Sequence, residues 1–216
     1  MKRIIVLLAL LLSLSGLTKA QDMIFTLNYN FGYTTGDFNT FVSEPAYRGG
    51  GLQYTKFLES NENIGIGMYI DWQGWYQKHE RSTFAYYGDN ASVSNSDMNA
   101  VKFAYLYVTP VMASFNYYPV KESSVLPFIG LNIGAVYTEQ ELNISAISNR
   151  VNTAWDFAVG AEAGLHVVFG ESGVGANVTG KYTYSFYKNT FHNIQLATED
   201  GNFVTLGVGL SFLMLR

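Results

Sequence analysis

The chain has 216 residues, a formal net charge of −4 and no cysteine, so disulfide bridges and thiolate metal centres are excluded. Hydrophobic residues make up 48% of the chain and aromatic residues 16%, whereas only 14% are charged. Ordinary soluble domains carry about 25% charged residues. A chain rich in aromatic residues and poor in charge is therefore unusual for a cytosolic protein.

The first twenty residues have the pattern of a secretory signal peptide. Lys2 and Arg3 precede a short apolar run, and Ala20 ends the segment. The run is shorter than the roughly 20 residues that a membrane-spanning helix needs. Cleavage would remove three basic residues and change the net charge from −4 to −7, which argues against nucleic acid as a partner. We expect a signal peptide over residues 1–20 and one exported domain over 21–216.

The exported part contains eight segments in which apolar and polar residues alternate, a period that indicates strands. The expected strands cover residues 23–33, 47–57, 64–76, 99–118, 127–141, 154–169, 174–187 and 204–214. Long polar loops are expected over residues 77–97, 141–153 and 188–201. Pro110 cannot donate to a strand ladder, so a bend is expected there. Short turns on one side and long loops on the other are typical of membrane barrels.

The strand PFIGLNIGAVYTEQE, over residues 127–141, indicates which face of the sheet is inside. Ile129, Leu131 and Ile133 alternate with Gly130 and Asn132. A soluble sheet usually covers its wet face with charged residues, whereas small residues suit a crowded polar interior behind an outer face in lipid. The alternative, a soluble lipocalin-like barrel, would place many aromatic side chains in a bore that eight strands leave just wide enough for side chains. The pattern favours the membrane barrel.

Tyrosine and tryptophan residues occur near the ends of the expected strands. They are Tyr33, Trp72, Trp75, Tyr76, Tyr117, Tyr118, Tyr137, Trp155 and Tyr187. Membrane barrels carry girdles of such residues at both interfaces with water. We therefore expect these side chains to form the girdles.

Several stretches resemble those of a known group of proteins. They are VTPVMASFNYYP (108–119), LPFIGLNIGAVY (126–137), WDFAVGAEAGLHVVF (155–169) and GKYTYSF (180–186). The chain is similar to the small outer-membrane barrels of Gram-negative bacteria, the OmpX/OmpW-like group. The resemblance covers nearly the whole exported domain and implies an all-β fold, a single eight-stranded antiparallel up-and-down transmembrane β-barrel. It also implies location in the cell outer membrane.

Three titratable residues are expected to face the bore. If GESG (170–173) makes a tight hairpin, Glu162 lies opposite Lys181, and His166 lies opposite Asn177. These groups could form a gate or a catalytic site. We favour a structural ion pair of Glu162 and Lys181, with His166 nearby, because buried charge requires a partner.

No catalytic, cofactor-binding or metal site is expected. His79 and His192 fall in expected loops, and neither they nor His166 form a cluster of metal ligands. Some barrels of this size act on lipid A through an outward-facing histidine and serine, and this pattern is not found here. The chain is therefore expected to be non-enzymatic.

The function expected from these patterns is that of an integral outer-membrane barrel with a structural or surface-interaction role and a polar, largely filled interior. Its expected partners are outer-membrane lipid, the barrel-assembly machinery and an extracellular partner bound through the long loops. One alternative is a narrow porin-like channel for small or apolar solutes. Another is a soluble exported ligand-binding barrel.

Overall fold

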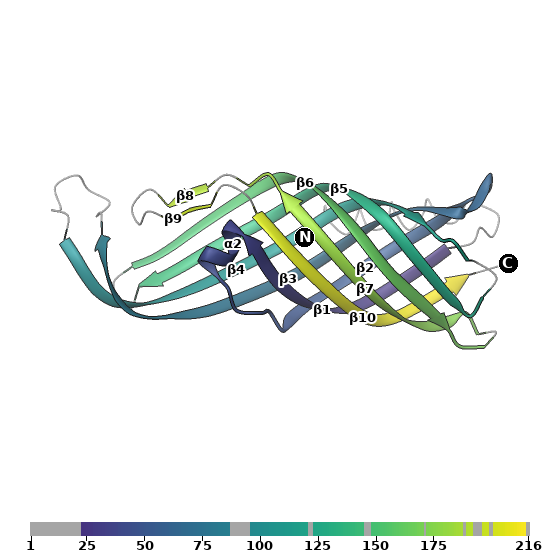
Figure 1. Ribbon diagram of the computed structural model, residues 1–216, viewed down its shortest axis with the longest axis horizontal. Helices are drawn as coiled ribbons and strands as arrows, with labels where there is room; N and C mark the ends of the chain where they lie inside the picture. Colours follow the sequence, from purple (N-terminus) through teal and green to yellow (C-terminus); the bar gives the residue numbers. More distant parts are fainter. Residues whose placement is uncertain are drawn as a thin grey trace, which may run out of the picture.

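The computed structural model describes residues 23–86, 96–120, 123–144, 148–170, 172–187, 189–191, 196–198 and 201–214. Its main feature is a closed barrel of eight antiparallel strands (Figure 1). The expected signal peptide, residues 1–20, and His192 lie outside the described residues.

The barrel strands follow one another around the ring in chain order. They are β1 (Met23–Gly36), β2 (Arg48–Leu58), β3 (Asn61–Tyr86), β4 (Ser96–Tyr117), β5 (Val125–Ile144), β6 (Ser148–Val168), β7 (Val174–Ser185) and β10 (Gly201–Met214). Pairing of β1 with β10 closes the ring. All eight expected strands are present, which confirms the all-β, eight-stranded antiparallel up-and-down barrel.

Two small elements lie in the connections and were not expected from the sequence. The helix α2 (Asp37–Phe41) follows β1. The strands β8 (Asn189–Phe191) and β9 (Leu196–Thr198) pair with each other in a separate sheet. Among the described residues, no helix is both long and apolar enough to cross a membrane.

The barrel wall carries apolar side chains on its outside and polar side chains on its inside. Leu131 is 68% exposed, whereas its neighbour Asn132 is 4% exposed. The same alternation holds on β1, where Leu27 is 50% exposed and Asn28 is 4% exposed. The wall therefore has the polarity expected of a transmembrane barrel and opposite to that of the soluble alternative.

Inward-facing glycines make room for large polar neighbours. A Cβ atom on Gly51 of β2 would overlap the Asp71 carboxylate, and one on Gly130 of β5 would overlap the side-chain amide of Asn116. These positions explain why glycine alternates with isoleucine and leucine. The bore is crowded, and each small residue leaves space for a side chain from the neighbouring strand.

Two of the expected long loops are wrong over most of their length. β3 and β4 stay paired as far as Tyr86 and Ser96, and β5 and β6 as far as Ile144 and Ser148. The sequence QKHERSTF after Tyr76 lacks clear alternation, so its polarity suggested a loop. Backbone hydrogen bonds between adjacent strands do not depend on that polarity, and the hairpins therefore continue beyond the barrel.

The long hairpins form a four-stranded sheet that projects from one end of the barrel, called here the long-loop end (Figure 1). On one side, β2 stops pairing with β3 at Arg48 and Gly74. On the other side, β7 stops pairing with β6 at Ser185 and Ala158. The opposite end, where short turns join β2 to β3, β4 to β5 and β6 to β7, is called the short-turn end.

Two apolar clusters fill the two ends of the bore. The cluster at the long-loop end includes Phe38 and Phe41 of α2, Trp75, Tyr187 and Phe203. Here α2 folds into the mouth of the barrel, and the ring of Phe38 packs against that of Tyr187 at 5.4 Å between centroids.

The cluster at the short-turn end closes the other side of the bore. It consists of Ile24, Phe57, Tyr118, Leu126, Phe128 and Leu213. The side chains of Phe57 and Phe128 both pack against Tyr118, with ring centroids 4.8 Å and 5.4 Å apart.

The expected aromatic girdles are correct for some residues and wrong for others. Trp75 is buried inside the barrel because it falls on an inward position of β3, and Tyr118 and Tyr187, just after the ends of β4 and β7, are buried as well. The residues that do lie on the outside are Tyr33, Trp72, Tyr76, Tyr117 and Trp155, together with half-buried Tyr137. Whether an aromatic residue belongs to a girdle therefore depends on the side of the sheet that it faces, and proximity to a strand end is not sufficient.

β4 keeps its register through Pro110. Its pairing with β5 is continuous, with Pro110 opposite Val136. On the side towards β3, the ladder omits the two pairs at Thr109 and Pro110, although the register is the same before and after them. Proline has no N–H group to donate on this side, and pairing with β3 is found on both sides of the gap in the same register, so Pro110 does not shift the strand.

Candidate functional site

A layer of buried charge lies between the two apolar clusters. It contains Asp71 of β3, Glu162 of β6 and Lys181 of β7, which are 3%, 4% and 3% exposed. Within the described residues, no other aspartate, glutamate or lysine side chain is buried. Each lies at an inward position of its strand, and together they form the candidate site.

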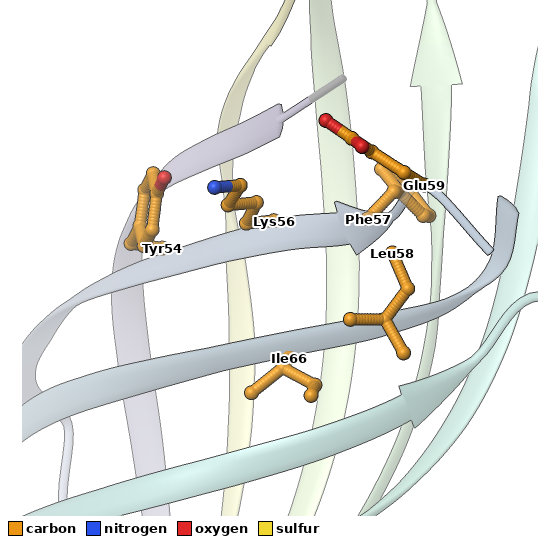
Figure 2. A pocket seen from close by; sticks show the side chains of 6 residues that line it. All are labelled: Tyr54, Lys56, Phe57, Leu58, Glu59 and Ile66. Atoms are coloured by element: carbon orange, nitrogen blue, oxygen red, sulfur yellow. The ribbon is translucent and has the colours of Figure 1, made fainter. Parts of the chain in front are cut away.

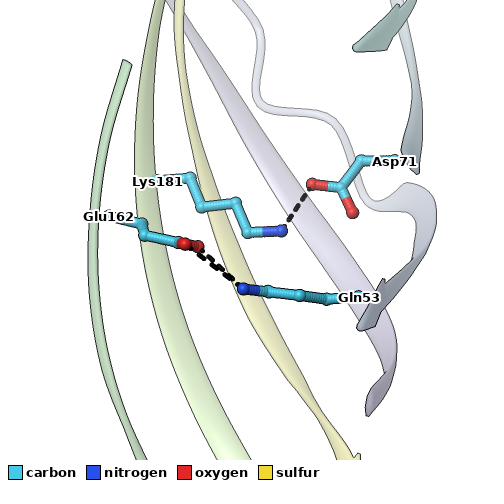
Figure 3. A network of polar contacts seen from close by, with 4 residues as sticks. All are labelled: Gln53, Asp71, Glu162 and Lys181. Carbon is cyan, nitrogen blue, oxygen red and sulfur yellow. Dashed lines mark hydrogen bonds and ion pairs between the residues drawn. The ribbon is translucent and has the colours of Figure 1, made fainter. Parts of the chain in front are cut away.

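Lys181 crosses the bore to form an ion pair with Asp71. The distance between Lys181 Nζ and Asp71 Oδ2 is 2.9 Å. The same ammonium group lies over the ring of Tyr69, 3.7 Å from its centroid. The two charged residues are 110 positions apart in sequence, and closure of the barrel places their strands on facing walls (Figure 3). This ion pair therefore ties two walls together.

Glu162 makes a second bridge across the bore. Gln53 of β2 donates from Nε2 to both carboxylate oxygens of Glu162, at 3.2 Å and 3.3 Å (Figure 3). The side-chain amide of Asn132, oriented with its nitrogen towards acceptors, donates to Glu162 Oε1 at 3.3 Å. The carboxylate is thus held by neutral amide donors from β2 and β5.

The expected neighbourhood of Glu162 and Lys181 is present. The two residues lie directly opposite each other in the ladder of β6 and β7. Their side chains extend to different partners, however, because Lys181 bonds Asp71 and Glu162 bonds Gln53 (Figure 3). A direct ion pair between Glu162 and Lys181 stays a prediction.

His166 faces the bore but belongs to the apolar layer at the short-turn end. It lies opposite Asn177, as expected from the tight hairpin. Its Nδ1 is 2.8 Å from Ser211 Oγ. Its ring stacks on Phe128, with centroids 5.1 Å apart, and lies 6.2 Å from the ring of Tyr118. These contacts give His166 a packing role apart from the Asp71–Lys181 pair.

Asp71 and Gln53 are the members of the site that the sequence did not assign. Both lie on the polar faces of expected strands, so their inward direction was recognisable. Their partners were not, since strands on opposite walls have no sequence signal that matches them. The described residues contain no group of three or more side chains suited to hold a metal ion.

His79 lies in β3 instead of the loop expected for it. Its Nε2 is 3.2 Å from the backbone oxygen of Phe41. Gln77, two residues earlier, accepts a hydrogen bond from the backbone N–H of Ser43 at 2.6 Å. These contacts attach the segment around α2 to the projecting part of β3.

No protein-family model matches this sequence, and comparison with curated proteins also gives no match. Solved structures do match. A major outer membrane protein from Thermus thermophilus aligns with a TM-score of 0.50 at 9% identity, over 89% of this chain and 99% of that chain. The chain has the fold of a small outer-membrane barrel.

Two further structures give similar values. Neisserial surface protein A aligns with a TM-score of 0.49 at 10% identity, over 90% of this chain and 97% of that chain. The outer membrane protein OprG from Pseudomonas aeruginosa aligns with a TM-score of 0.49 at 14% identity, over 90% of this chain and 96% of that chain.

Proposed function

We propose that this protein is an integral outer-membrane barrel with a closed bore and that it acts through the surface it presents at the long-loop end, without enzymatic activity. The observation that carries the proposal is the filling of the bore: two apolar clusters enclose a buried polar layer that two bridges cross, Lys181 to Asp71 and Gln53 to Glu162.

The outer wall supports residence in a bilayer. Ile129, Leu131 and Ile133 on β5 are 62%, 68% and 54% exposed. Similar apolar side chains cover the outside of the other barrel strands, with Trp72 and Trp155 towards the long-loop end. Such a surface would be unfavourable in water, whereas an apolar band flanked by aromatic residues is stable in a bilayer. Outer-membrane lipid is therefore a partner in this proposal, and insertion by the barrel-assembly machinery is part of it.

The filled bore favours a structural or surface-interaction role over a channel. Glu162 and Lys181 are both directed into contacts that cross the bore. Phe38 and Phe128 stand on either side of this layer, each with an exposed fraction of 2% or less. A solute that passed through would have to displace both apolar layers and break the polar contacts between them.

The projecting four-stranded sheet is the part of the molecule best placed to contact an extracellular partner. β3 to β6 continue beyond the point where β2 and β7 end. Along β5, the outward positions change at this point from apolar residues to Glu139 and Glu141. The change matches the passage from a lipid-facing wall to a water-facing one.

Location is tested by fractionating cells that express the full chain. We expect the protein in the outer-membrane fraction, with a change in gel migration between unheated and boiled samples that reports a folded barrel. Recovery of the processed protein in the soluble fraction, without detergent, would contradict membrane residence.

The closed bore is tested by single-channel recording in planar bilayers. The purified barrel should give no steady openings, and a porin of known conductance serves as the control for assay sensitivity. Reproducible openings that depend on the amount of inserted protein would refute the closed bore and support the narrow-channel alternative.

A further inference from the structure

The outside of the barrel carries a lysine at the short-turn end. Lys56 of β2 lies opposite Met23 of β1 and opposite Ile66 of β3. Among the described residues it is the only basic residue that faces outward at this end, since Arg48 and Lys78 lie at the long-loop end. A lysine on the lipid face is unfavourable unless its ammonium group reaches a polar partner.

Lys56 lines a cavity in the outer wall. The cavity has a volume of about 340 Å³ and is lined by Tyr54, Lys56, Phe57, Leu58, Glu59 and Ile66 (Figure 2). The Lys56 amine extends towards the hydroxyl of Tyr54, and the carboxylate of Glu59 lies further along the same side (Figure 2). Leu58 and Ile66 provide an apolar surface beside these polar groups.

The arrangement combines a cationic group, a hydroxyl donor and an apolar surface near the short-turn end of the wall, where β2 ends at Leu58. Lys56 and Tyr54 are both half-buried residues on the outer face of β2. An ammonium group and a hydroxyl can both donate to phosphate oxygens, and such charge-assisted hydrogen bonds are stronger than neutral ones. The neighbouring leucine and isoleucine suit an acyl chain.

We propose that this cavity binds the phosphate of a glycerophospholipid from the leaflet at the short-turn end. Lys56 and Tyr54 hold the phosphate, and one acyl chain lies along Leu58 and Ile66. This inference rests on the proposed function, because it needs the barrel to lie in a bilayer.

The binding is measured by native mass spectrometry of the full exported chain in detergent micelles. Palmitoyl-oleoyl-phosphatidylethanolamine is the probe, and the corresponding diacylglycerol, which lacks phosphate, is the control lipid. Wild-type protein should retain the phospholipid about tenfold more than the diacylglycerol, as expected for one charge-assisted contact. Lys56→Gln should lose this preference, and Lys56→Arg should keep most of it.

Lys78→Gln is the control variant because Lys78 is an exposed lysine of β3 that lies on the projecting sheet, away from the short-turn end. It should bind the phospholipid like the wild type. Equal retention of phospholipid by wild type and Lys56→Gln would overturn the site, and so would equal retention of phospholipid and diacylglycerol by the wild type.

Flotation with phosphatidylethanolamine-containing vesicles separates this inference from the proposed function. Co-flotation of both wild type and Lys56→Gln, with selective loss of bound lipid in the variant, supports the site. If both variants float and retain lipid equally, the site is refuted while the membrane barrel stands. If the wild type does not associate with vesicles at all, the proposed function itself fails.

Discussion

Replacing Lys181 by methionine isolates the contribution of the ion pair that crosses the bore. The variant keeps much of the side-chain volume but leaves the Asp71 carboxylate without its cation. Both residues are 3% exposed, and their charged atoms are 2.9 Å apart. Two unit charges at this distance attract each other by about 6 kcal/mol at an effective dielectric constant of about 20.

Desolvation offsets much of that attraction, so the relevant quantity is the cost of removing one partner. Breaking a buried pair in this way typically costs about 3–5 kcal/mol, because an uncompensated charge remains. We expect a loss of this size in the free energy of unfolding for Lys181→Met. The lost contact of the ammonium group with the Tyr69 ring acts in the same direction.

The assay is urea unfolding of the barrel in lipid vesicles, followed by tryptophan fluorescence and by the gel shift between folded and unfolded forms. Asp71→Leu and the double variant Lys181→Met/Asp71→Leu complete a double-mutant cycle. The double variant should be more stable than Lys181→Met alone, because it removes the Asp71 carboxylate together with its cation, while Glu162 keeps its amide donors. The coupling energy should reach about 3 kcal/mol, at the upper end of the usual range.

A second cycle compares Glu162 with Asp71 as the partner of Lys181. The variants are Glu162→Leu alone and combined with Lys181→Met. The structure predicts weaker coupling in this cycle, since Gln53 and Asn132 bind the Glu162 carboxylate. Stronger coupling of Lys181 to Glu162 than to Asp71 would refute this reasoning and support the direct Glu162–Lys181 pair.

Two further predictions use the same unfolding assay. Gly51→Ala should lower the free energy of unfolding by about 1–3 kcal/mol, because a Cβ atom would overlap the Asp71 carboxylate. Gly50→Ala is the control and should be tolerated, since its Cβ atom would meet the nearest atom at an ordinary 3.5 Å. Equal losses of stability in the two variants would contradict a crowded bore. Leu131→Arg, at an outward position 68% exposed, should cost about 2–4 kcal/mol near the bilayer midplane. Val151→Arg, 54% exposed on the projecting sheet, should change stability little, and a harmless Leu131→Arg would argue against a lipid-facing wall.

The alternation of residue types was enough to predict the barrel and the direction of most side chains. Ile129, Leu131 and Asn132 lie on the expected faces because the side-chain period of a strand is two, and one face must meet lipid. Register between adjacent strands was also accessible where a short turn sets it, as for Glu162 opposite Lys181. These are local properties, and local sequence carries them.

The extent of β3 and β4 was not accessible in the same way. Beyond the barrel, residues such as Lys78 and Glu80 no longer alternate with apolar residues on a lipid-facing wall. The strand persists there because backbone groups of the hairpin pair with each other. The alternation of apolar and polar residues depends on what each face of a strand contacts. It is therefore lost beyond the lipid-facing wall, even though the strand continues.

The partners across the bore were decided by tertiary structure alone. The sequence indicated that Asp71, Glu162 and Lys181 face inward, and that buried charge needs compensation. Which carboxylate receives the ammonium group depends on closure of the ring between β1 and β10, which brings β3 and β7 onto facing walls. A contact between residues 110 positions apart cannot be predicted from either strand alone, because the sequence of a strand specifies only the face on which each of its side chains lies.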